Sequence, residues 1–264
     1  MKISIVTISY NQAQFLERAI CSIVTQDFDD LEYIVVDPGS TDGSRDLIES
    51  YRPQIAQTVY EPDNGPADGL NKGFSYATGD IFGFINADDE LLPGALSKVA
   101  DYFEKHPQID VACGSGFIVD AAGAVIKRIM PTRFSKRLAV YGAVTFFQQG
   151  AFFRRSAFCE AKGFNKENRT CWDGELLLDM AINGRKFGVF YEDIATFRIH
   201  EASISGSGRL AELYRSDCNR LFAKAMGREM NLVDRLLMQI YLIEKWIINP
   251  RVTLTRILDI LKGN

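Results

Sequence analysis

The stretch Phe82-Gly83-Phe84-Ile85-Asn86-Ala87-Asp88-Asp89-Glu90 places an apolar run directly before three consecutive carboxylates. Buried strands of parallel sheets are continuous apolar runs, and ligands bind outside their carboxyl ends. A strand that delivers Asn86, Asp88 and Asp89 to such an edge provides hard oxygen ligands for a divalent cation. The same residues also suit a turn that caps the next helix. This stretch alone therefore leaves both interpretations open.

The sequence around this stretch alternates between strand and helix signals. Buried-type apolar runs alternate with segments in which apolar residues recur at helical spacing. This alternation predicts a doubly wound, mostly parallel α/β sheet with helices on both faces and right-handed crossovers. The expected strands are 3–9, 31–37, 57–61, 81–86 and 110–113, and the expected helices are 13–25, 44–51, 66–77 and 93–104.

The pattern changes after Gly114. Residues 117–119 and 124–129 flank a turn and predict a hairpin. The segments that follow predict a second half of the domain, on the acceptor side and at the edge of the same sheet. They are a polar loop at 130–137, a strand near 150–153, helices from 156 and over 172–183, and strands at 187–191 and 195–199.

The tail from about Leu210 is expected to be helical. Three uses of its apolar face remain open: packing on the protein's own body, dimerisation, and peripheral contact with a membrane surface. The face consists of Leu232, Val233, Leu236, Leu237, Ile240, Ile243 and Ile247, and a second run follows Pro250 with Leu254, Ile257, Leu258 and Leu261.

Composition limits the functional classes. The chain has 264 residues, of which 47% are hydrophobic and 24% charged, as is usual for a globular protein with a sizeable core. A net charge of −4 argues against a nucleic-acid partner. Five dispersed cysteines without a CxxC pair favour a reducing compartment over a disulfide framework or a zinc site. Without a signal-peptide pattern or an apolar run of membrane-spanning length, we expect a cytoplasmic protein, either free or peripheral at the inner face of the membrane.

Four polar clusters close the predicted strands. Each has a simpler explanation as a helix cap or a turn, but their convergence on one sheet edge favours a binding site. No GxGxxG follows the first strand, and GxxxxGK[ST] is absent. The clusters are Thr7 with Ser9-Tyr10-Asn11, Asp37 with Gly39–Gly43, Asp63–Asp68 with Asn71-Lys72-Gly73, and the opening stretch.

Three of these motifs together resemble the family 2 glycosyltransferases of the GT-A fold. They are Val6-Thr7-Ile8-Ser9-Tyr10-Asn11, Val35–Gly43 and Asn86-Ala87-Asp88-Asp89. The resemblance covers about residues 1–205, divided into a nucleotide-binding half (1–115) and an acceptor-side half (116–205), with 206–264 as a helical extension. It implies an inverting transfer of a sugar from a nucleotide-sugar donor to a glycan or lipid-linked acceptor of a cell-surface polysaccharide, with Mg²⁺ or Mn²⁺ as cofactor. The expected donor is a UDP-sugar.

By matching position, the resemblance implies a role for each donor-side residue. Asp88 would be the main metal ligand, with Asn86 on the ribose and Asp89 facing the sugar or the following helix. The nucleotide-binding residues would be Thr7, Ser9, Asn11, Asp37, Asp68 and Lys72.

Two positions depart from the family pattern. Pro38 stands where the second carboxylate of Asp-Asp-Gly-Ser is usual, and Asn86 stands at the first position of the DxD-type motif. Asn86 is a weaker cation ligand than aspartate. Both departures leave the choice of nucleotide open.

An inverting displacement also needs a base that takes the proton of the acceptor hydroxyl. Thr170–Leu176 resembles the family's acidic segment, which places Asp173 in the base position and leaves Glu175 as the alternative. Trp172 beside them is suited to stack on a sugar ring. The same spacing also fits Asp173 as a helix cap with Glu175 in the first turn.

Two later segments also match the family. Phe197-Arg198-Ile199-His200 resembles the segment whose histidine reaches the metal or the diphosphate, so His200 is a candidate ligand alongside a merely structural role. Gln148-Gln149-Gly150 resembles the acceptor-side strand, where Gln149 would hold a sugar hydroxyl. Residues 205–208, Ser-Gly-Ser-Gly, predict a flexible loop beside the donor.

Two other functional classes are alternatives to a glycosyltransferase. A sugar-phosphate nucleotidyltransferase also uses an α/β sheet and carboxylate-bound Mg²⁺, but it usually has a Gly-rich basic loop after the first strand, which Ser9–Ala13 is not. A non-catalytic module that binds nucleotide sugars or glycans fits the departures at Pro38 and Asn86. The presence of Asp88, Asp173 and His200 together favours the enzyme.

Overall fold

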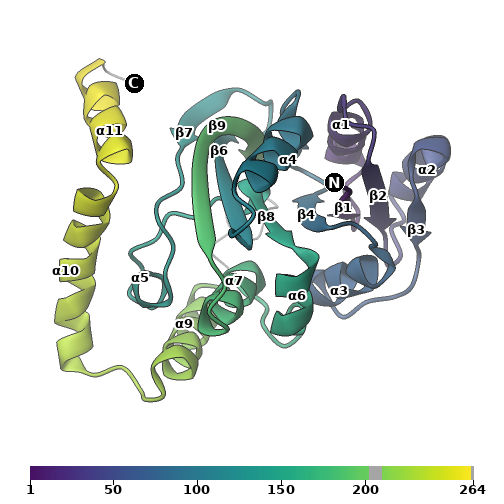
Figure 1. The fold of residues 1–264 in the computed structure, drawn as a ribbon. Coiled ribbons are helices and arrows are strands. Elements are labelled where there is room, and N and C mark those ends of the chain that lie inside the picture. The colour runs from purple at the N-terminus through teal and green to yellow at the C-terminus, as the bar shows by residue number, and fades with distance from the viewer. Residues whose placement is uncertain (202–209, 263–264) are drawn as a thin grey trace.

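The computed structural model describes residues 1–201 and 210–262, and within it nine strands form one mixed sheet. The strand order is β3-β2-β1-β4-β8-β6-β9-β5, with β7 paired to β6 (Figure 1). The strands are β1 (Ile3–Ile8), β2 (Leu31–Val36), β3 (Gln57–Val59), β4 (Ile81–Asn86), β5 (Glu90–Leu91), β6 (Val111–Val119), β7 (Val125–Ile129), β8 (Ala151–Arg154) and β9 (Phe187–Arg198).

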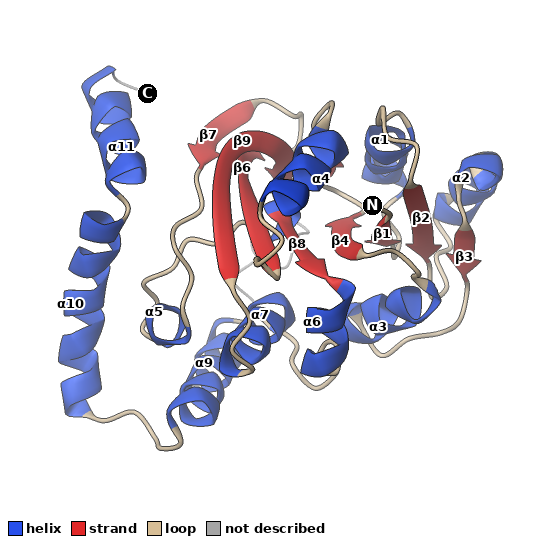
Figure 2. Ribbon diagram, viewed as in Figure 1, coloured by secondary structure: helices blue, strands red, loops and turns tan. Residues whose placement is uncertain are grey.

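Helices cover both faces of the sheet, as predicted (Figure 2). α1 and α4 each bury an apolar stripe and turn polar residues outward, whereas α3 and α7 also bury a carboxylate, Asp68 and Glu175. In the first three quarters of the chain the helices are α1 (Ala13–Val24), α2 (Ser44–Ser50), α3 (Pro66–Tyr76), α4 (Ala95–Lys105), α5 (Lys136–Val140), α6 (Arg155–Ala161) and α7 (Trp172–Ile182), with 3₁₀ turns η1 (Arg52–Gln54) and η2 (Gln148–Gly150).

Two hydrophobic layers hold the helices on the sheet. On one face, Leu16 of α1, Ile48 of α2 and Phe103 of α4 pack into a single buried cluster. On the other face, Phe74 of α3 and Met180 of α7 belong to a second cluster, together with α6. The helix α3 lies especially close to the sheet, because a Cβ at Gly73 would come within 2.5 Å of the Val6 side chain.

The first strands of the chain have the predicted parallel arrangement. β1 pairs in parallel with both β2 and β4, and Ile8 is in register with Val36 and with Asn86. The carboxyl ends of these three strands therefore lie side by side. The polar residues that follow the strands are delivered to one edge, as the sequence predicts.

The second half differs from its predicted segments in two places. The expected strand 110–113 and the first hairpin strand 117–119 are one strand, β6: Gly116 pairs with Ala195, and Gly114 lies at a register shift that does not end the strand. The expected strands 187–191 and 195–199 are likewise one strand, β9, which passes the intervening polar residues through two register shifts against β6. The glycines and polar residues that mimic turns lie inside irregular but continuous strands.

A short strand that the sequence analysis did not predict connects the two halves. β5 pairs antiparallel with β9, with Glu90 opposite Thr196 and Leu91 opposite Ala195. This pairing holds the segment after β4 against the end of β9. Residues 88–90 and 198–200 thus become neighbours although more than 100 residues separate them.

The tail is helical, as predicted, with α9 (Ala211–Met226), α10 (Leu232–Ile248) and α11 (Pro250–Lys262). α9 lies beside α7, whereas α10 and α11 follow one another along one side of the molecule (Figure 1). Leu138 and Tyr141 of the α5 region pack with Phe222 and Tyr241 in a third cluster. No helix in the described part of the chain is long and apolar enough to cross a membrane. The predicted domain boundary after residue 205 and the predicted loop 205–208 lie outside the described residues.

Candidate active site

Asp88 and His200 meet at the carboxyl edge of β4. The His200 ring nitrogen Nε2 lies 3.0 Å from Asp88 Oδ2, and the ring rests on Phe15 of α1 with 4.8 Å between ring centroids. The pairing of β5 with β9 creates this contact. Both candidate metal ligands named from the sequence are therefore brought together.

Asp89 is turned inward and is completely buried. Its carboxylate accepts hydrogen bonds from the Gln149 amide at 2.7 Å, from the Arg198 backbone N–H at 2.9 Å and from the Asn86 amide at 3.1 Å. Burial, and secondarily the neighbouring charge of Asp88, raise the pKa of Asp89. These contacts assign Asp89 to holding the loop, and a contact with the sugar stays a prediction.

The two glutamines of η2 support the same loop. Gln148 donates to the Phe84 carbonyl at 3.0 Å and accepts from Asn86 at 3.4 Å. Gln149 is 4% exposed and its amide nitrogen is used by Asp89. Its contact with an acceptor hydroxyl stays a prediction, whereas its hydrogen bond to Asp89, in the loop after β4, is direct.

Arg198 completes this arrangement. Its guanidinium is 1% exposed, forms an ion pair with Glu90 and donates to the carbonyls of Asp88 and Asp120 at 3.0 and 3.1 Å. The sequence analysis assigned no role to Arg198, which it named only as a neighbour of His200. A conspicuous signal was present, since an arginine near the end of an apolar strand is buried only if it is paired.

Unsatisfied polar atoms gather at the ends of the three parallel strands. Among the described residues, seven buried polar side-chain atoms have no hydrogen-bond partner, although such atoms are normally paired. Three of them follow or end neighbouring strands: Ser9 Oγ after β1, Asp37 Oδ2 after β2 and Asn86 Oδ1 on β4. Hydrogen-bonding capacity left open in adjacent positions is what a polar ligand would use.

Asp37 is held rigidly in place beside this open capacity. Its Oδ1 accepts from the backbone N–H groups of Gly39 and Ser40 at 3.0 and 2.8 Å and from Arg45 Nε at 3.0 Å. The Arg45 guanidinium also lies over the Tyr60 ring, 4.8 Å from its centroid. One carboxylate oxygen is thus fixed by the protein and the other is left open.

Thr7 and Asn11 hold the loops after β1 and β2 in place. Thr7 is fully buried and its hydroxyl accepts from Tyr33 at 3.1 Å. Asn11 adopts a left-handed backbone (φ 52°), and its side chain accepts from the Thr41 N–H at 2.9 Å, which connects the loops after β1 and β2. Both side chains shape the loops, and their contact with a nucleotide stays a prediction.

Asp68 and Lys72 lie on α3, next to a cation that the sequence analysis did not single out. Asp68 is 3% exposed and pairs with Lys166 at 2.7 Å, while Lys72 Nζ stands 4.0 Å away. Lys166 and Lys72 hold the pKa of Asp68 below its usual value despite burial. Lys72 also donates to the Pro62 carbonyl.

Asp173 occupies the first turn of α7 and is partly exposed. Burial raises the pKa of its carboxyl. The preceding Trp172 packs its ring against Phe84 of β4 and Phe164, each 5.5 Å away between centroids. This packing sets the start of α7 beside β4, two residues before Asn86, and it leaves sugar stacking by Trp172 as a prediction.

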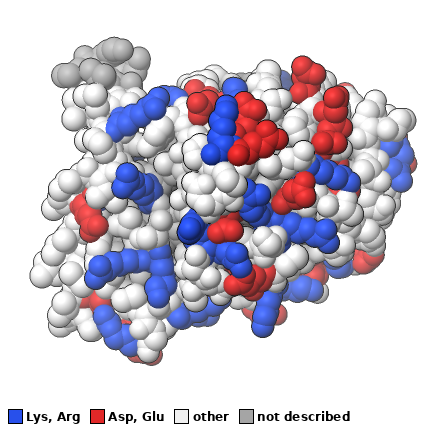
Figure 3. All heavy atoms as spheres, in the orientation of Figure 1, with Lys and Arg blue, Asp and Glu red and all other residues white. Residues whose placement is uncertain are grey.

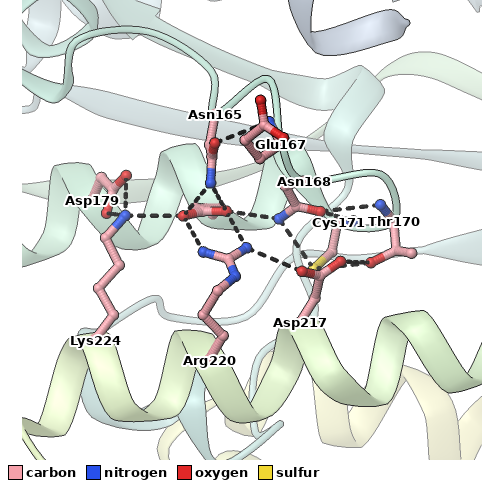
Figure 4. A network of polar contacts seen from close by, with 10 residues as sticks. Asn165, Glu167, Asn168, Thr170, Cys171, Asp179, Asp217, Arg220 and Lys224 are labelled. Atoms are coloured by element: carbon pink, nitrogen blue, oxygen red, sulfur yellow. Dashed lines mark hydrogen bonds and ion pairs between the residues drawn. The ribbon is translucent and has the colours of Figure 1, made fainter.

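Glu175 has partners on α9, Arg220 and Lys224, and in the loop before α7, Asn165 and Asn168; Figure 4 labels these four residues. It is 1% exposed, pairs with Arg220 at 2.7 Å and Lys224 at 3.0 Å from α9, and accepts from Asn168 at 2.8 Å. Together these partners outweigh burial and lower its pKa to about 2. Such a carboxylate is a very weak base, so the contacts do not favour Glu175 as the alternative base.

The chemistry of Asp88 and His200 fits a divalent cation. Asp88 Oδ2 and His200 Nε2 lie 3.0 Å apart, within hydrogen-bonding distance, and a carboxylate and an imidazole placed together would both be able to hold such an ion. Within residues 1–201 and 210–262, no group of three or more His, Cys, Asp or Glu side chains gathers as a metal site. Two protein ligands suit an ion whose other positions are filled by phosphate oxygens and water.

Comparisons with known proteins agree with this arrangement. The sequence profile of glycosyl transferase family 2 matches residues 4–161. An uncharacterized glycosyltransferase of Nostoc is 29% identical over 214 residues, 77% of this chain and 66% of that protein. A second relative, the GalNAc(5)-diNAcBac-PP-undecaprenol beta-1,3-glucosyltransferase of Campylobacter jejuni, is 37% identical over 102 residues, 37% of this chain and 33% of that protein.

Solved structures share the fold. Staphylococcus aureus TarS 1–349 in complex with UDP-GlcNAc superimposes with a TM-score of 0.71 at 19% identity, over 94% of this chain and 72% of that one. The Pyrobaculum calidifontis mannosyltransferase PcManGT, in complex with GDP-Man and Mn²⁺, gives 0.65 at 20% identity, over 91% and 69%. The predicted GT-A fold is thereby confirmed, and the chain belongs to glycosyl transferase family 2.

Proposed function

We propose that this protein transfers a sugar, with inversion, from a UDP-sugar to a glycan or lipid-linked acceptor of a cell-surface polysaccharide. The observation that carries the proposal is the set of open buried atoms of Ser9, Asp37 and Asn86 beside the Asp88–His200 pair. Neighbouring unsatisfied atoms and a two-ligand cation site match the nucleoside and diphosphate parts of one donor. The similar proteins, one solved in complex with UDP-GlcNAc and one named for an undecaprenol-linked acceptor, support the same substrate classes.

Each donor-side residue would act on a defined part of the donor. Asp37 Oδ2 would accept from the nucleobase, and Ser9 and Asn86 would hydrogen-bond to the base or the ribose. Asp88 and His200 would hold Mg²⁺ or Mn²⁺, which when bound supplies a Lewis acid for the departing diphosphate. Asp89, Gln149 and Arg198 would keep that loop in position, as conserved outer contacts do around metal ligands in general.

Asp173 would be the general base. Its raised pKa brings the carboxylate closer to the operating pH than an ordinary aspartate, which improves proton transfer. It would take the proton from the acceptor hydroxyl as that oxygen attacks the anomeric carbon and the bond to the nucleoside diphosphate breaks. Trp172, fixed on Phe84, would orient the turn that presents it.

A panel of nucleotide sugars tests the proposal. Purified protein is incubated with each donor, with Mn²⁺ or with EDTA, and release of nucleoside diphosphate is measured. We expect release from a UDP-sugar with Mn²⁺ and its loss in EDTA. Activity unaffected by EDTA would rule out the cation role. Calorimetric binding of nucleotide without turnover of any donor would favour the non-catalytic binding module.

A further inference from the structure

Helix α10 exposes a row of aliphatic residues and buries two charged ones, Asp234 and Lys245, which is unusual for a helix of a globular protein. Successive residues of a helix are rotated by about 100°, so six aliphatic residues fall within one arc of roughly 100°. These residues are 50–79% exposed, although leucine, isoleucine and valine are usually buried. We call them the outer stripe: Leu232, Val233, Leu236, Ile240, Ile243 and Ile247.

The opposite face of α10 carries its buried polar groups. Asp234 is completely buried, accepts from the Tyr141 hydroxyl at 2.7 Å and pairs with Arg228 at 2.6 Å. Tyr241 stacks on Tyr141 with 4.6 Å between centroids, and Lys245 is 8% exposed. Leu237, Met238 and Ile248 of α10 also pack inward. The outward aliphatic residues take no part in that packing, so the core of the protein does not account for them.

The outer stripe is continuous rather than scattered. It runs the length of α10, and Leu254 and Ile257 of α11 add exposed fractions of 59% and 49%. Single exposed apolar residues are normal, but a contiguous row of this kind marks an interaction surface.

The charges around the stripe identify its partner. Residues 228–264 contain six Lys or Arg and four Asp or Glu, an excess of two positive charges in a chain whose net charge is −4. The exposed Arg256 lies over the ring of Trp246, 4.6 Å from its centroid, and tryptophan is frequent at membrane interfaces. In Figure 3, Lys and Arg outnumber Asp and Glu on the side of α10 and α11.

We propose that the outer stripe docks this protein on the headgroup region of an anionic lipid bilayer. Aliphatic side chains would enter the boundary between headgroups and acyl chains while the exposed Arg235 and Arg256 contact lipid phosphates. A second copy of this chain is the less suitable occupant, because it would bring the same excess of positive charge to the contact. The inference does not depend on the proposed sugar transfer, since it requires only binding.

Vesicle flotation tests the proposal with a matched pair of variants. Leu236→Gln/Ile243→Gln removes two stripe residues that are 65% and 62% exposed. Val125→Gln/Ile126→Gln removes two residues of β7 that are 62% and 57% exposed. On vesicles of phosphatidylglycerol and phosphatidylethanolamine, we expect the first pair to lower the partition coefficient by about tenfold or more and the second to leave it unchanged. Wild-type binding should also fall in high salt and on phosphatidylcholine alone.

Two controls keep the result interpretable. All four substitutions lie on exposed side chains, so the thermal unfolding midpoint should stay within a few degrees of wild type. Light scattering in solution then separates the alternatives. Equal flotation of both double variants, or a wild-type dimer that Leu236→Gln/Ile243→Gln dissociates without any wild-type binding to vesicles, would overturn the proposal.

Discussion

The carboxylates at the sheet edge and the carboxylate between α7 and α9 differ in how their surroundings satisfy them. At the ends of β1, β2 and β4, atoms of Ser9, Asp37 and Asn86 are buried without partners, whereas Asp89 at the same edge is hydrogen-bonded by Asn86, Gln149 and Arg198. Around Glu175, two cations and two amides fill the hydrogen-bonding capacity of one buried group. Open capacity indicates a ligand that is bound from outside, and filled capacity indicates a structural junction. This difference separates two acidic motifs that are equally conspicuous in the sequence.

The largest expected effect concerns the base. Asp173→Asn removes the proton acceptor without changing size, and we expect kcat to fall by about 10²–10⁴-fold with an unchanged unfolding midpoint. Glu175→Gln should change kcat by far less at a temperature where the variant is folded, because Glu175 already pairs with Arg220 and Lys224. The reverse order of the two kcat values would exchange the roles assigned to these residues.

The second effect concerns stability. Glu175→Gln leaves the cations of α9 without their buried counter-charge, and we expect a loss of about 2–4 kcal/mol in the free energy of unfolding. Denaturant titration measures it. The control is Asp101→Asn, which breaks the exposed pair with Lys105 (3.4 Å) and should cost less than about 0.5 kcal/mol. Equal losses of unfolding free energy in the two variants would contradict the assignment of Glu175 to a structural junction between α7 and α9.

The pH dependence follows from the same junction. The pKa of Glu175 is lowered in the folded protein to about 2, so the unfolded chain takes up a proton first as the pH falls. Its stabilisation is therefore complete above about pH 4.5 and is lost as the pH falls towards 2. Wild-type stability should drop more steeply than that of Glu175→Gln between pH 4.5 and 3. Parallel curves would show that Glu175 does not titrate with a lowered pKa.

The smallest expected effect concerns Gln149, which supports Asp89 in the loop after β4. Gln149→Ala removes the 2.7 Å hydrogen bond to Asp89, and we expect about a tenfold rise in the Mn²⁺ concentration that gives half-maximal activity. Gln108→Ala, on an exposed residue, should leave that concentration unchanged. A change in the apparent KM for acceptor alone would instead place Gln149 on the acceptor side, as the sequence resemblance implies.

The parallel half of the fold could be predicted from the sequence because its signals are local. The run Ile81–Asn86 has the same bounds in the structure, and the register of β1 with β2 and β4 explains why separate polar clusters converge. The second half was predicted less well. The glycines of β6 resemble turns in the sequence, yet pairing with β8 and β9 keeps them in the sheet.

The sequence could identify the residues of the candidate site, but not the long-range contacts that bring them together. Asp88, His200 and Asp37 were identified from their positions after strands, but the pairing of β5 with β9 that brings His200 to Asp88 is a long-range contact of a two-residue strand. No local pattern predicts such a contact. The partners of Glu175 on α9 could likewise not be predicted, since 45 and 49 residues separate Glu175 from Arg220 and Lys224.

The most direct test of the account is calorimetric titration of UDP with and without Mn²⁺ in wild type, Asp88→Asn and Glu175→Gln. If the open edge is the donor site, Mn²⁺ strengthens UDP binding at least about tenfold, or 1.4 kcal/mol, in wild type and in folded Glu175→Gln, and Asp88→Asn abolishes that gain. An undiminished Mn²⁺ effect in Asp88→Asn would contradict the assignment of the cation and the diphosphate to this edge.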